Sequence, residues 1–89
     1  MSIAYIDGRD PEAQPPLTIQ HINIWKRAPS EPMQRIKMQL QHGARVTVLQ
    51  IIKHNGRNWA QIKKGWRVGW ILESFLSNKR EEPIGDLIL

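Results

Sequence analysis

The sequence predicts an all-β fold: a small barrel of five or six short strands over residues 17–77, with a short extension at each end. Three observations lead to this prediction. The chain has 89 residues, enough for one small domain. Short runs of alternating apolar and polar residues recur about every 8–12 residues, separated by turn-forming residues. The Asn55-Gly56 pair is the strongest short hairpin signal, because both residue types tolerate positive φ.

The first half of the predicted barrel holds the less regular elements. Residues 17–24 carry apolar side chains whose alternation slips by one, which predicts a bulge or turn at Gln20-His21. Residues 25–32 contain two prolines and are predicted to form a loop. Residues 33–40 alternate from Ile36 onward, so they fit either a strand or a short irregular segment.

The second half reads as a meander of strands. Residues 46–52 are apolar and rich in β-branched side chains, which makes them the strongest predicted strand. After the Asn55-Gly56 turn, the return strand is expected at residues 59–63. The next turn is expected at Gly65, and a further strand at residues 67–72. Residues 73–76 are too short for a helix and are expected to form one tight turn before a last residue or two of strand.

Charge divides the chain into three parts. Residues 1–16 are the predicted N-terminal arm, with three prolines and a formal charge of −2, and residues 78–89 are the predicted C-terminal tail, with a charge of −1. Residues 17–77, the predicted domain, hold ten basic and two acidic side chains, a formal charge of +8, and all four tryptophans. The domain is therefore more basic than the whole chain, whose charge is +5.

Several function classes are excluded by composition or lack support in it. Without cysteine, the chain has no disulfide, no thiolate zinc site and no cysteine nucleophile. His21, His42 and His54 have neither paired spacing nor a carboxylate motif, so no metal site is expected. The glycines are scattered and the serines lie in no nucleophile motif. We therefore expect a protein that is not an enzyme and that needs no cofactor.

Two further features of the sequence indicate the cellular compartment of the protein. No apolar run approaches the roughly 20 residues that span a bilayer, so no membrane partner is expected. Residues 1–10 lack the basic start and the uninterrupted apolar run of a secretory signal. The sequence therefore predicts a cytoplasmic protein.

Several short motifs follow one another in a distinctive order. They are Ile22-Asn23-Ile24, Ala28-Pro29-Ser30, the strand that begins after Gly43, Asn58-Trp59-Ala60-Gln61-Ile62, Gly65, Gly69-Trp70-Ile71 and Phe75-Leu76. In order and spacing they resemble the bacterial type of Src-homology-3 domain, and the resemblance covers residues 19–77. This family implies a small β-barrel that acts as a binding module. The sequence departs from the family at Ala28, where glycine is usual, and in a loop one residue longer that contains Trp25.

The resemblance implies where a ligand would bind. It puts Trp59, Trp70, Leu72 and Phe75 near the face that the wider family uses for ligands. The alternative is that these large side chains pack the small barrel. Eukaryotic relatives attract basic, proline-rich peptides with an acidic loop. Here Glu31 is the one acid of the corresponding loop and has cationic neighbours, which disfavours such a ligand.

Two further features are candidates for binding. Trp66 follows Gly65 in a predicted turn among cations, where an exposed indole suits base stacking or a protein hot spot; alternatively, the indole lies flat on the barrel under lysine stems. A predicted basic patch would attract phosphates or an acidic protein surface, or would serve as a solvated face. It comprises Lys53, Arg57, Lys63, Lys64 and Arg67.

The expected function is a non-catalytic adaptor that docks a protein or peptide through an aromatic face of a small basic barrel. The alternatives are a nucleic-acid-binding barrel, a peptidoglycan-binding module if the protein is exported, and a structural subunit. Both termini carry apolar residues, at 3–6 and at Ile84, Leu87, Ile88 and Leu89. We therefore expect part of at least one terminus to pack against the barrel or against a second copy in a homodimer.

Overall fold

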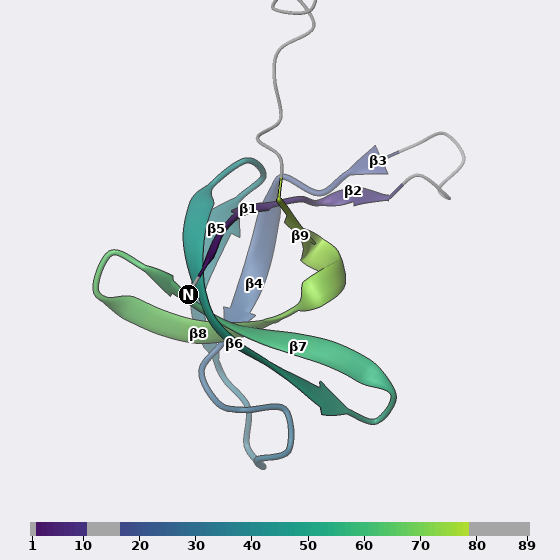
Figure 1. The fold of residues 1–89 in the computed structure, drawn as a ribbon, viewed down its shortest axis with the longest axis vertical. Coiled ribbons are helices and arrows are strands. Elements are labelled where there is room, and N and C mark those ends of the chain that lie inside the picture. Colours follow the sequence, from purple (N-terminus) through teal and green to yellow (C-terminus); the bar gives the residue numbers. More distant parts are fainter. Residues whose placement is uncertain (1, 11–16, 79–89) are drawn as a thin grey trace, which may run out of the picture.

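A seven-stranded antiparallel sheet dominates the computed structural model, which describes residues 2–10 and 17–78 (Figure 1). Its strands are β1 (Ser2–Ile6), β4 (His21–Trp25), β5 (Ile36–Gln41), β6 (Arg45–His54), β7 (Arg57–Lys64), β8 (Arg67–Leu72) and β9 (Leu76–Ser77). A second sheet pairs β2 (Arg9–Asp10) with β3 (Leu17–Thr18), and one 3-10 turn, η1, spans Glu73–Phe75. The prediction of an all-β fold is confirmed.

The predicted closed barrel of five or six strands is wrong in closure and in strand number. The strand order is β5-β4-β8-β7-β6-β1-β9, so β5 and β9 are edges of an open ladder. The difference arises because β1, from the predicted N-terminal arm, lies between β6 and β9. It pairs with β6 from Ser2↔Val48 to Tyr5↔Arg45 and with β9 at Ile6↔Leu76. A segment predicted to lie outside the barrel therefore adds a strand to the sheet.

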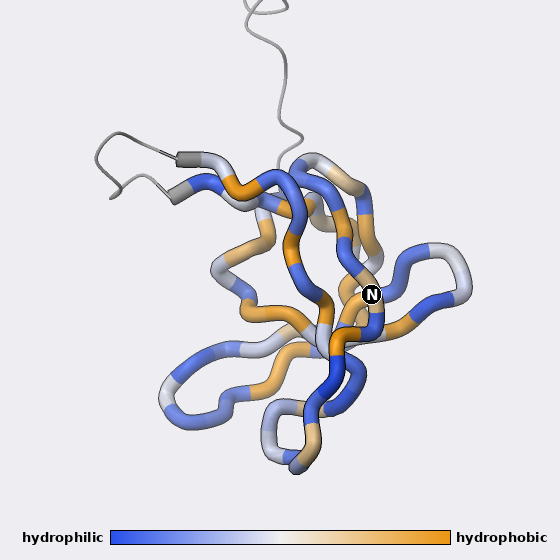
Figure 2. Tube along the Cα trace, turned by 180° about the vertical axis from the view of Figure 1, so that it is seen from behind, coloured by the Kyte–Doolittle hydropathy of each residue, from blue (hydrophilic) through white to orange (hydrophobic). Residues whose placement is uncertain are grey.

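The sheet is bent so that one of its faces encloses the core. Neighbouring strands lie about 4.8 Å apart, so in a flat sheet β5 and β1 would be separated by about 24 Å. Nevertheless Met38 of β5 and Ile6 of β1 belong to one apolar cluster. Its largest fully buried side chains are Ile6, Ile24, Ile62 and Ile71. Figure 2 shows apolar stretches toward the middle of the molecule and hydrophilic residues at the hairpin tips.

Two tight hairpins define the part of the sheet that carries the candidate sites. Asn55 and Gly56 connect β6 to β7 with φ values of 52° and 77°, as a type I′ turn requires, which confirms the predicted hairpin. Gly65 and Trp66 connect β7 to β8, and Gly65 has a φ of 63°, which fits the first position of a type II′ turn. Successive turns of a meander lie at opposite ends of their shared strand, and Figure 1 shows these hairpins on opposite sides of the molecule.

Other predicted elements can be compared with the structure directly. The break predicted at Gln20-His21 is present, because β3 ends at Thr18 and β4 begins at His21. The tight turn predicted at residues 73–76 is η1 followed by β9. The N-terminus packs on the sheet as β1, as expected for one of the termini. The apolar C-terminal residues Ile84, Leu87, Ile88 and Leu89 lie outside the described residues. Within the described chain, no helix has the length and apolar character needed to cross a membrane.

Candidate ligand-binding groove

A groove of about 310 Å³ lies between the loop of residues 26–35 and the β6–β7 hairpin. Its lining residues are Trp25, Pro29, Gln34, His54, Asn55 and Trp59. The volume is at the lower end of the range for ligand pockets, so it suits one or two side chains of a larger partner. We call this feature the aromatic groove.

The register of three strands brings the tryptophans of the groove to one face of the sheet. Trp70 of β8 is opposite Trp25 of β4 on one side and opposite Gln61 of β7 on the other. Directly opposed residues share a face, and so do residues two apart on a strand. Trp25, Trp70 and Trp59 therefore lie on the face opposite the one that carries Ile62 and the core.

The three indoles differ in how much surface they leave for a ligand. Trp70 is only 7% exposed and does not line the groove. Trp25 and Trp59 are half-buried and both line it. Trp70 thus acts as packing between the strands, whereas Trp25 and Trp59 offer indole surface to a partner.

The loop that forms one wall of the aromatic groove is held by the amide of Gln34. Gln34 Nε2 donates to the carbonyl oxygens of Arg27 and Ala28, and Oε1 accepts from the backbone N–H of Arg27 at 3.0 Å. At the base of the loop, the N–H of Lys26 donates to the carbonyl oxygen of Arg35 at 2.8 Å. The wall therefore has a defined shape before any ligand arrives.

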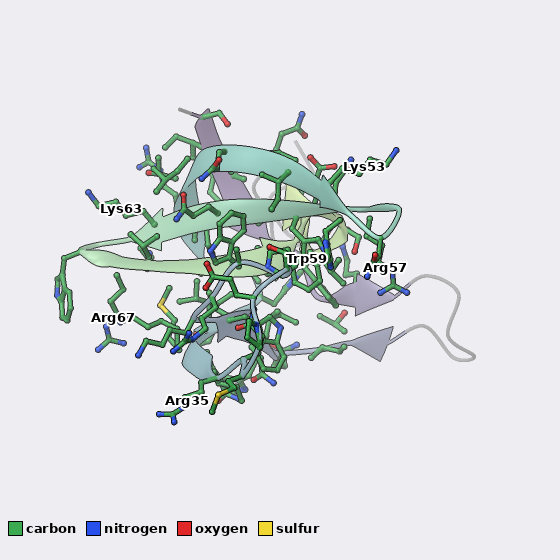
Figure 3. The ribbon with its side chains drawn as sticks, turned by 90° about the horizontal axis from the view of Figure 1, so that it is seen from below. Arg35, Lys53, Arg57, Trp59, Lys63 and Arg67 are labelled. Carbon is green, nitrogen blue, oxygen red and sulfur yellow. The ribbon has the colours of Figure 1, made fainter. Side chains whose placement is uncertain are left out.

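Cations outnumber acids on the two elements that enclose the aromatic groove. The loop contributes Lys26, Arg27 and Arg35, all exposed, against one acid, Glu31. The hairpin contributes the exposed Arg57, which is two residues from Trp59 and shares its face, whereas Lys53 pairs with Asn58 and lies on the opposite face (Figure 3). The aromatic groove is therefore an apolar hollow between two elements with a net positive charge.

The remaining residues of the predicted aromatic face are not gathered at the aromatic groove. Leu72 is half-buried and lies opposite Trp59 across β7 and β8. Phe75 lies in η1 and packs against the core. Trp66 is 81% exposed at the β7–β8 turn, at the other end of β7. Trp25 was missed as a ligand residue; the alternation of β4, with Ile22 and Ile24 buried, is the signal that puts it on the outer face.

The structure divides the predicted basic patch into two groups (Figure 3). Lys53 and Arg57 flank the β6–β7 turn, whereas Lys63, Lys64 and Arg67 flank the β7–β8 turn. β7 rises about 3.3 Å per residue, so about 23 Å of strand separates Arg57 from Lys64. Closeness in sequence did not bring the five cations together, because consecutive turns point in opposite directions.

A second hollow, of about 540 Å³, contains none of the residues predicted for binding. It is lined by Ser2, Ile3, Ala4, Asp7, Val48, Ile51, Glu73, Leu76, Ser77 and Asn78. Asp7 Oδ2 pairs with Arg9 Nη2 at 2.9 Å, and Asp7 Oδ1 accepts from the backbone N–H of Arg9. The hydrogen bond from the Arg9 side chain lowers the pKa of Asp7 below its ordinary value of 3.8.

Neither a metal site nor a similar protein of known function accompanies the aromatic groove in the described residues. Across residues 2–10 and 17–78, no three His, Cys, Asp or Glu side chains gather closely enough to hold a metal ion. Comparison of the chain with protein-family models, curated proteins and solved structures gave no match.

Proposed function

We propose that this protein is a non-catalytic module that binds a protein or peptide partner in the aromatic groove. The observation that carries the proposal is the pair of half-buried indoles, Trp25 and Trp59, lining one hollow between a hydrogen-bonded loop and the β6–β7 hairpin. Tryptophan is among the side chains that most often dominate binding energy at protein interfaces. A preformed hollow also reduces the entropy that is lost when a partner binds.

The charge around the aromatic groove indicates the chemistry of the partner. Four exposed cations, Lys26, Arg27, Arg35 and Arg57, and one acid belong to the loop and to the groove face of the hairpin. Such a charge attracts acidic segments and repels basic ones, and it accelerates association more than it increases affinity. We therefore expect the partner to place one apolar or aromatic side chain in the hollow, with Asp or Glu beside it.

The resemblance to bacterial Src-homology-3 domains supports the same location. The resemblance implies that Trp59, Trp70, Leu72 and Phe75 lie near the face where the wider family binds ligands, and of these four Trp59 lines the aromatic groove. Membership of that family remains part of the proposal. The acidic preference expected here differs from the basic, proline-rich peptides of the eukaryotic relatives.

Selection from a display library of short random peptides tests the proposal. The full chain is used as bait, beside its Trp59→Ala and Trp66→Ala variants. We expect a motif with one apolar anchor flanked by acidic residues, enriched by the wild type and by Trp66→Ala but not by Trp59→Ala. A motif enriched equally by Trp59→Ala, or no enriched motif, would contradict the proposal.

A further inference from the structure

The β7–β8 hairpin carries an exposed indole that the aromatic groove does not use. Trp66 is 81% exposed, the largest value among the large apolar side chains of the described residues. The guanidinium carbon of Arg67 lies 5.4 Å from the centroid of its ring, within the range of a cation–π contact. The indole is thus held beside a cation at the tip of a two-residue turn.

The residues that flank this turn are positively charged, and the surrounding segment of the sequence contains no acidic residue. Lys63, Lys64 and Arg67 are exposed and flank the turn. Residues 45–72 contain no Asp or Glu. We call Lys63, Lys64, Trp66 and Arg67 the basic hairpin.

We propose that the basic hairpin is a binding site for single-stranded nucleic acid. An unpaired base stacks on Trp66, and backbone phosphates pair with the surrounding lysine and arginine side chains. Stacking on an aromatic ring combined with a positively charged path for the phosphates is the general mode of single-strand binding. A duplex keeps its bases stacked inside, so it cannot offer a base face to Trp66.

The composition of the tip favours nucleic acid over a lipid surface. Within residues 63–67, Trp66 is accompanied by glycine and three cations and by no second apolar side chain. Inserting this tip into a bilayer would move three cations toward the hydrocarbon, which is unfavourable, and would bury only one indole in return. The site is independent of the aromatic groove, because the two hairpins lie at opposite ends of β7 (Figure 1).

Fluorescence anisotropy of the full chain with a labelled oligothymidylate of about 12 nucleotides tests the proposal. We expect binding whose logarithmic salt slope is about −2, since each of three phosphate contacts contributes about −0.7. Lys63→Gln combined with Lys64→Gln should make the slope shallower by about 1.4. The matched control, Lys53→Gln combined with Arg57→Gln on the other hairpin, should leave the slope unchanged.

The role of Trp66 is tested with two variants. Trp66→Ala should weaken binding about 5- to 100-fold, and Trp66→Phe should recover most of the loss because it keeps a ring for stacking. Both should keep the wild-type melting temperature, since the indole is exposed.

Four results would overturn the proposal. The first is no change in anisotropy at about 50 mM salt. The second is that the Lys53→Gln, Arg57→Gln control changes the salt slope as much as the Lys63→Gln, Lys64→Gln variant does. The third is an affinity for a duplex of the same length equal to that for the single strand, and the fourth is binding to phosphatidylglycerol vesicles without binding to the oligonucleotide.

Discussion

Trp25 and Trp70 lie directly opposite each other on β4 and β8. Among the described residues, they are the one pair in register between these strands, and β8 is the neighbour through which β4 and β5 join the rest of the sheet. Trp25 also immediately precedes the loop of residues 26–35, whereas Trp59 lies on β7, next to β8. The Trp25–Trp70 contact therefore sets the position of one wall of the aromatic groove relative to the other.

Gly69 permits this close approach of β8 and β4, and replacing it should be costly. A Cβ at position 69 would lie 2.5 Å from Ile24 Cγ2 and 3.0 Å from the carbonyl oxygen of Trp25. We expect Gly69→Ala to lower the free energy of unfolding by about 1–3 kcal/mol, as overpacked cores do, measured by urea denaturation. Peptide binding in the aromatic groove should weaken as well, because the wall that begins at Trp25 would shift.

Gly43→Ala serves as the control for this variant. A Cβ at position 43 meets no heavy atom within 4 Å, but the φ of +90° strains any other residue. Gly43→Ala should therefore lower stability by about 1–2 kcal/mol through backbone strain alone and leave peptide binding intact. If the Gly43 variant weakened binding as much as the Gly69 variant, the β4–β8 joint would not be what positions the aromatic groove.

Truncating two tryptophans should separate stability from binding. Trp70→Ala removes a buried indole and should lower the free energy of unfolding by about 3–5 kcal/mol. Trp59→Ala removes a half-buried one, so it should lower stability less while abolishing peptide binding. Thermal denaturation and a binding isotherm of each variant provide the comparison. The opposite order of stabilities would mean that Trp59, and not Trp70, is the packing residue.

Gln34 should matter for binding more than for folding. Its amide joins Arg27 and Ala28 across the loop, so Gln34→Ala should leave the loop less restrained and weaken peptide binding about tenfold, with a change in unfolding free energy of about 1 kcal/mol or less. Gln39→Ala is the matched control. It removes a hydrogen bond from Gln39 Nε2 to Asn23 Oδ1 on exposed strand surface away from the loop. Equal losses of affinity in the two variants would contradict a role for Gln34 in shaping the wall.

Asp7 should make stability depend on pH in acid. Its pKa is lowered by the hydrogen bond from the Arg9 side chain, so the carboxylate stabilises the fold fully above pH 3.8, and this contribution disappears as the pH falls through the lower folded-state pKa. Asp7→Asn keeps an oxygen for the Arg9 N–H but removes the charge. It should lower the free energy of unfolding by less than about 1 kcal/mol at neutral pH, because Arg9 is largely exposed.

The comparison is made by denaturant unfolding at neutral pH and well below pH 3.8. The difference between wild type and Asp7→Asn should shrink toward zero in acid. A difference that stayed constant across this range would show that the ion pair is not its source.

Local features of the fold could be predicted because their causes are local. The Asn55-Gly56 turn requires positive φ at two adjacent residues, and few residue pairs accept it. The break before His21 followed from a slip in the apolar alternation. Val48 and Ile62 are buried where the alternation of their strands predicts. Each of these features depends on a few neighbouring residues.

The parts that could not be predicted depend on contacts distant in sequence. Nothing in residues 2–6 specifies that they pair with β6, 40 or more residues away, and this pairing is what makes the ladder longer than expected. The two prolines after Trp25 predict a loop at this residue, whereas its position on β4 depends on Trp70 lying opposite it. The separation of Lys53 from Lys63 is an exception, because it follows from the order of turns and strands along the chain and not from a distant contact.

The central claim is that the aromatic groove is where the partner binds, and the four indole N–H signals in a two-dimensional NMR spectrum test it most directly. Trp25 and Trp59 line the aromatic groove, Trp70 is buried beside it and Trp66 lies at the far hairpin. On titration with an acidic peptide carrying one apolar anchor, we expect the signals of Trp25 and Trp59 to move and that of Trp66 to stay. Movement of Trp66 while Trp25 and Trp59 remain fixed would contradict the account.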